Sequence, residues 1–71
     1  MNKYQVIVGN IGTVYDGNWA IMAKKVYKEY YEQSKDGYGR AAGESVTLWV
    51  YGEPIEDNEE VCRFFESLEK N

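Results

Sequence analysis

Hydrophobic and polar residues alternate near the start of the chain, and a period of two is typical of a half-buried β-strand. In residues 4–8, Tyr4, Val6 and Val8 fall on one face. Glycine and asparagine in residues 9–12 interrupt the pattern, which resumes at residues 13–15. Both residue types tolerate the positive φ of a turn. We therefore expect a β-hairpin, with a bulge marked by Gly9 or Gly12.

A third alternating stretch covers residues 45–51. Its two faces are Val46, Leu48 and Val50, which we expect to face a helix, and Thr47, Trp49 and Tyr51, which we expect to face away. Residues 51–54 form a predicted turn. Residues 54–56 could form a short edge strand, where a proline is tolerated.

A helical period follows the hairpin. Asn18 is a good N-cap residue, and a helix is expected to reach about Ser34, with Gly37 just after its C-terminus. The apolar face consists of Trp19, Met22, Ala23, Val26 and Tyr30, with Tyr27 and Tyr31 on its flank. On the polar side, we expect the i,i+4 ion pairs Lys25–Glu29 and Lys28–Glu32.

A second amphipathic helix is predicted at the C-terminal end. Asp57 and Glu60 have the spacing of an acidic capping pair, and they precede a stripe of Val61, Phe64, Phe65 and Leu68. We expect this helix to cover the sheet face left open by the first helix. The predicted fold is one α+β domain over residues 1–71, a small antiparallel sheet in the order β-β-α-β-(β)-α.

The composition favours binding over catalysis. The 71 residues include one cysteine and no histidine, so an internal disulfide is excluded and the commonest general base is missing. We expect no enzyme activity, cofactor or metal. With no signal-peptide core and no apolar run near the roughly 20 residues of a membrane span, we expect a cytoplasmic protein without a membrane segment.

Charge is distributed unevenly. Residues 1–43 have six basic and four acidic residues, whereas residues 44–71 have two basic and eight acidic ones. Such polarity favours oriented docking or self-association over a uniformly basic nucleic-acid surface.

The glycine-rich loop, residues 37–44, separates the first helix from the third strand. Its glycine spacing misses the G-x-G-x-x-G pattern and runs from helix to strand, which disfavours a phosphate-binding loop. Tyr38 and Arg40 are residue types enriched at binding hot spots. Arg40 could contact a partner, or it could hold the loop to Glu44 or to the acidic C-terminal part.

Two charged sets are candidate binding surfaces. The acidic segment is Glu53, Glu56, Asp57, Glu59 and Glu60; it could mimic a nucleic-acid backbone or be a solvated turn with acids favourable at a helix N-terminus. The lysine–tyrosine face is Lys24, Lys25, Lys28, Tyr31 and Lys35; it combines cations with a ring, as single-strand nucleic-acid surfaces do. Glu29, Glu32 and Asp36 on the same helix oppose that interpretation.

Two segments, GNIGTVYDG at residues 9–17 and SKDGYGRAAGESVTL at residues 34–48, resemble short phage and prophage proteins of unknown function. With the GEPI turn at residues 52–55, the resemblance covers about residues 4–55. It implies a viral accessory role, often one that blocks or redirects a host protein, and it assigns no catalytic residue.

We therefore expect a non-enzymatic protein that binds a host or defence protein, for example as an anti-CRISPR-like or nucleic-acid-mimicking inhibitor. The expected contacts are Tyr38, Arg40 and the acidic segment. A nucleic-acid-binding module and a self-associating structural protein are the alternatives.

Overall fold

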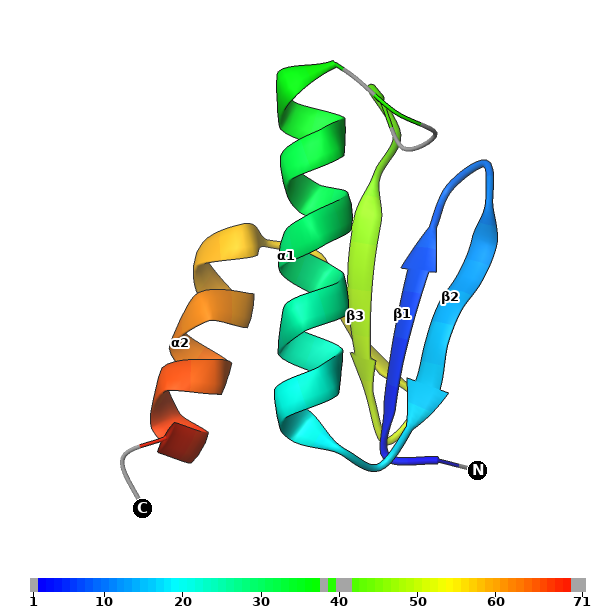
Figure 1. The fold of residues 1–71 in the computed structure, drawn as a ribbon. Helices are drawn as coiled ribbons and strands as arrows, with labels where there is room; N and C mark the ends of the chain where they lie inside the picture. Colours follow the sequence, from blue (N-terminus) through cyan, green and yellow to red (C-terminus); the bar gives the residue numbers. More distant parts are fainter. Residues whose placement is uncertain (1, 38, 40–41, 70–71) are drawn as a thin grey trace.

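The computed structural model describes residues 2–37, 39 and 42–69, and shows a four-stranded antiparallel sheet with two helices (Figure 1). The elements are β1 (Tyr4–Val8), β2 (Gly12–Gly17), α1 (Ala20–Asp36), β3 (Val46–Val50), β4 (Glu53–Ile55) and α2 (Asn58–Glu69). The predicted α+β fold is confirmed, including its short edge strand.

The strand order is β2-β1-β3-β4, so the N-terminal strand lies inside the sheet. In the β1–β2 ladder, Val6 lies opposite Tyr15 while Ile7 lies opposite Thr13, which leaves Val14 as the extra residue. The bulge is therefore at Val14, and its prediction at Gly9 or Gly12 is wrong. The extra residue turns Tyr15 to the helix side of the sheet, where its hydroxyl accepts a hydrogen bond from the Trp19 N–H at 3.2 Å.

Both helices lie on the same face of the sheet (Figure 1). Val61 and Phe65 of α2 share the core with Tyr4 and Leu48, and the Phe64 ring meets Tyr4 edge-on, with centroids 6.0 Å apart. The expectation that α2 covers the opposite face is therefore wrong. A helix about 10 Å wide covers roughly two strands spaced about 4.8 Å apart, so the apolar face of four strands needs two helices.

The opposite sheet face, with Ile7, Thr47 and Trp49, has neither helix over it. These three side chains are half-buried. As predicted, Thr47 and Trp49 point away from the helices while Val46 and Leu48 are buried beneath them.

The buried side of α1 is rotated from the predicted one. Ala23 and Tyr27 are buried, whereas Trp19 is 62% exposed and Met22 is 37% exposed. Tyr27 belongs to the common core, and its hydroxyl also bonds Asn58 of α2, so this residue lies at the centre of the buried side and not on its flank.

Local signals at the helix ends have mixed outcomes. Gly37 ends α1 at φ +74°, as expected. Asp57 caps α2 by accepting a hydrogen bond from the Glu59 N–H at 2.9 Å, but among the described residues Glu60 makes no return bond to Asp57, so only half of the predicted capping pair forms. Asn18 does not cap α1, because its side-chain oxygen accepts the Lys3 N–H at 2.7 Å. No helix within residues 2–37, 39 and 42–69 has the length and apolar character needed to cross a membrane.

Candidate functional site: a groove between the two helices

Two surface hollows adjoin each other along the line where α1 meets α2. One of about 330 Å³ lies toward the C-terminal end of α1, and one of about 520 Å³ lies toward its N-terminal end. Both are lined by Lys24, Lys28 and Phe65, so they form one continuous groove. We call this the interhelical groove.

Apolar side chains from both helices form much of its lining. They include Ile21, Tyr27 and Tyr31 of α1 and Val61, Phe65 and Leu68 of α2. The α2 residues are the stripe predicted from the sequence, one side of which is buried on the sheet while another side borders the groove. Ile21 is 71% exposed, so apolar surface at the N-terminal end of the groove faces solvent.

Tyr27 connects the two helices at the groove. Its hydroxyl donates a hydrogen bond to Asn58 Oδ1 at 3.2 Å, and its ring stacks on Tyr31 with centroids 5.8 Å apart and an interplanar angle of 14°. Burial, with a smaller effect of neighbouring Tyr31, raises the pKa of Tyr27 to about 12. Near neutral pH the Tyr27 hydroxyl therefore keeps its proton, which it uses in the hydrogen bond to Asn58.

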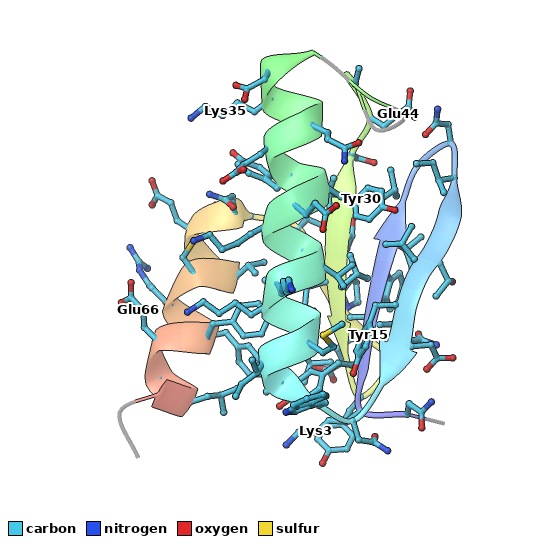
Figure 2. All side chains as sticks on the ribbon, viewed as in Figure 1. Lys3, Tyr15, Tyr30, Lys35, Glu44 and Glu66 are labelled. Carbon is cyan, nitrogen blue, oxygen red and sulfur yellow. The ribbon has the colours of Figure 1, made fainter. Side chains whose placement is uncertain are left out.

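The lysine–tyrosine face lies along the α1 side of this groove. Lys24, Lys28, Tyr31 and Lys35 line the first hollow, and Lys25 joins Lys24 and Lys28 in the second. Figure 2 shows Lys35 near the C-terminal end of α1 and Glu66 on α2. The structure therefore brings this whole set of predicted residues to one feature.

The lysine side chains at this rim are not neutralised by the predicted ion pairs. Within the described part of the chain, Lys25 forms no ion pair with Glu29, and Lys28 forms none with Glu32. Those two expectations are wrong; an exposed i,i+4 pair gains only about 0.3–0.5 kcal/mol, which hardly offsets the ordering of two long side chains. Glu59 and Arg63 of α2 do form an i,i+4 ion pair, an exposed contact at 3.8 Å.

The groove has two electrostatically different halves. Glu32 and Glu66 line the C-terminal hollow together with lysines. In the N-terminal hollow the charged lining residues are Lys24, Lys25 and Lys28, and none of the described residues lining it is acidic. An anionic group is therefore favoured most over the N-terminal half.

The acidic segment lies elsewhere, on β4 and the first turn of α2. Glu53, Glu56 and Glu60 are exposed. Asp57 caps the N-terminus of α2, and the Glu59 carboxylate forms an exposed ion pair with Arg63. None of the five acidic residues lines the interhelical groove, so the two charged sets belong to separate surfaces.

The two hot-spot candidates in the glycine-rich loop, Tyr38 and Arg40, lie outside the described residues. The described ends of the loop are fastened to its neighbours: the Gly43 N–H bonds the Ser34 carbonyl at 3.2 Å, and the Ser34 hydroxyl donates to the Glu44 carbonyl. These bonds join the end of α1 to the start of β3 and give the loop ends a structural role.

Sequence reasoning missed the apolar part of the site. Ile21 and Leu68 line the groove, as does the exposed thiol of Cys62. The sequence pattern predicts Phe65 and Leu68 only as residues of the apolar stripe that faces the core. Ile21 is an apolar residue on the otherwise polar side of α1, and this is the signal in the sequence that could have indicated a binding surface. That Ile21 belongs to a groove depends on the position of α2, which the α1 sequence does not contain.

The groove has the chemistry of a binding surface. No group of three or more carboxylates or thiols within the described residues could hold a metal ion.

Comparisons of the chain with protein-family models, with curated proteins and with solved structures give no match. The resemblance to short phage proteins therefore rests on the quoted sequence segments alone.

Proposed function

We propose that this chain is an accessory protein that acts without catalysis, by binding and modulating another protein through the interhelical groove. The observation that carries the proposal is the combination of an apolar lining with an exposed lysine rim between two helices. Ile21 is 71% exposed at one end, and Lys25 and Lys28 have no ion pair to a described residue. Interfaces commonly combine an apolar centre with a polar rim in this way.

The size of the chain supports binding as its mode of action. A core of 71 residues supplies only about 3–5 kcal/mol of net stability. Leaving Trp19 and Ile21 exposed, at 62% and 71%, gives up apolar burial that such a small protein could use. Burial of that surface against a partner would recover it.

The biological setting of the proposal comes from the sequence resemblance. Short phage proteins similar over residues 4–55 suggest a phage-type protein whose partner is a host or defence protein. Within that proposal the acidic segment is a second contact surface, which could compete with nucleic acid for a basic site as an anti-CRISPR-like inhibitor would.

Site-specific photo-crosslinking tests the proposed function. A photoreactive amino acid would replace Glu66, an exposed residue lining the groove, and in a control it would replace Thr13, an exposed residue of β2 on the other sheet face. In lysate of the host cell, we expect a defined protein to be cross-linked from position 66 and not from position 13.

Two results would contradict the proposal. One is the same set of cross-linked proteins from both positions, which indicates non-specific contact. The other is the absence of any cross-linked protein from position 66 while both variants keep the melting temperature of the parent chain.

A further inference from the structure

We infer that the interhelical groove takes an acidic amphipathic helix of the partner. The inference rests on the proposed protein-binding function and specifies the partner segment. It combines three properties of the groove: its length, its apolar lining and its lysines on the α1 side.

The length of the groove suits a helix of several turns. Its lining residues on α1 run from Ala20 to Lys35, and at about 1.5 Å per residue they span roughly 22 Å. A helix of about 14 residues has that length. Its width of about 10 Å allows it to lie over two neighbouring helices, as helices do when they pack together.

The lining chemistry favours a helix over an extended peptide. Apolar side chains such as Ile21, Phe65 and Leu68 cannot satisfy the N–H and C=O groups of an extended segment. A helix satisfies most of these groups internally and presents only an apolar stripe. Residues at i, i+3, i+4 and i+7 of the partner would contact the lining.

Charge complementarity makes the expected helix acidic. Lys25 and Lys28 are exposed, have no ion pair to a described residue, and line the N-terminal hollow with Lys24. Carboxylates flanking the apolar stripe of the bound helix would meet these lysines. Glu32 and Glu66 line only the other hollow, so we expect the acidic residues of the partner to concentrate over the N-terminal half.

Nucleic acid fits the same lysines less well. Phosphates that follow Lys28 to Lys35 would pass Glu32 and Glu66, which line the same hollow. Base stacking needs accessible ring faces, but Tyr27 is only 2% exposed and Tyr31 is half-buried and stacked on it. The predicted nucleic-acid face is thus better suited to a protein helix.

A displayed helix library tests the inference. Each member would be about 14 residues long, with apolar residues fixed at the i, i+3, i+4 and i+7 positions and all others randomised. Selection against the parent chain should enrich Asp and Glu beside the apolar stripe. Soluble peptides made from the enriched sequences would then provide affinities.

The critical variant is K25Q/K28Q, matched with T13E/S45E. Each double substitution lowers the net charge by two, and the control residues are exposed and outside the groove. We expect K25Q/K28Q to weaken the selected peptides by at least about threefold, from the loss of two exposed ion pairs. The control should bind within about twofold of the parent, with both melting temperatures close to that of the parent.

The inference is overturned by selected helices without acidic enrichment, by affinities that K25Q/K28Q leaves unchanged, or by a library that yields no binder. It is also overturned if a short single-stranded DNA binds the groove more tightly than any selected helix, or if sedimentation shows that a second copy of this chain occupies it. A partner cross-linked at position 66 together with any of these results would leave the proposed function standing. If no protein is cross-linked from position 66, both the proposed function and the inference of an acidic partner helix are contradicted.

Discussion

The hydroxyl of Tyr27 on α1 donates a hydrogen bond to the side-chain oxygen of Asn58, the first residue of α2, at 3.2 Å. The two residues are separated by 31 positions in the chain, yet their contact lies beside the interhelical groove. It connects the helix that carries the lysines to the helix that carries the opposing apolar residues.

Replacing Tyr27 with phenylalanine isolates this bond. The ring and its stacking on Tyr31 remain, while Asn58 loses its partner, at a cost of about 1 kcal/mol. For a domain of this size, we expect a melting temperature lower by about 4–8 °C. Tyr31→Phe is the control, because the Tyr31 hydroxyl makes no hydrogen bond to a described residue. Equal effects of the two substitutions would contradict the role given to this bond.

Alkaline pH should destabilise the protein partly through Tyr27. Its pKa is raised to about 12 in the folded state from an unfolded value of 10.0, so the unfolded chain loses this proton first as pH rises. The contribution to stability is complete below pH 10 and is lost progressively between pH 10 and about 12. Urea unfolding measured between pH 10 and about 12 should show that the free energy of unfolding falls more steeply with pH for the parent chain than for Tyr27→Phe. Parallel losses would show that Tyr27 does not contribute.

Attachment of α2 should depend strongly on Phe65. This side chain is 4% exposed and belongs to the common core, and removing such a ring costs about 3–5 kcal/mol. That is comparable with the whole net stability expected of so small a domain. We therefore expect Phe65→Ala to detach α2 or unfold the chain, seen as lost helical circular dichroism.

The nearby Cys62→Ser substitution is the control for Phe65. Cys62 is exposed, so its replacement should change stability by no more than about 0.5 kcal/mol. A Phe65→Ala variant with the parent's melting temperature and helical signal would show that α2 is not held by this core.

Gly37 should be needed for its backbone conformation alone. Its φ is +74°, and an added Cβ would meet no atom within 4 Å. Gly37→Ala should thus cost about 1–2 kcal/mol, without any steric clash, and Gly37→Asn should cost less because asparagine tolerates this conformation better. Urea unfolding provides the comparison. If Gly37→Ala leaves the free energy of unfolding unchanged, the role given to Gly37 at the end of α1 is contradicted.

Neutralising the acidic segment should weaken partner capture if it is a second contact surface. The variant E53Q/E56Q avoids Asp57 and Glu59, which have structural contacts. E29Q/D36N is the matched control, with the same charge change at exposed positions of α1. We expect a loss of up to about tenfold for the first variant only, measured as cross-linking yield from position 66 against protein concentration. Equal losses would indicate a general effect of net charge.

The helical and extended elements could be predicted because their signals are local. Alternation at Tyr4, Val6 and Val8 places these residues on the buried side of β1, since successive side chains of a strand point to opposite faces. Gly37 and Asp57 mark helix ends because the backbone conformation or capping bond involves only residues nearby. The lysine–tyrosine set could be predicted for the same reason: residues three and four apart share one side of a helix.

The parts that could not be predicted depend on contacts between distant residues. The sequence alone could place Val61 and Phe65 on one side of a helix, and it determined the order of elements and the uneven charge. Only the tertiary structure decided that α2 lies beside α1 on the same sheet face, which moves Tyr27 into the core and leaves Trp19 exposed. The physical reason is that periodicity identifies which side of an element is apolar, but it does not specify which neighbour covers that side. The groove exists only where the two helices meet.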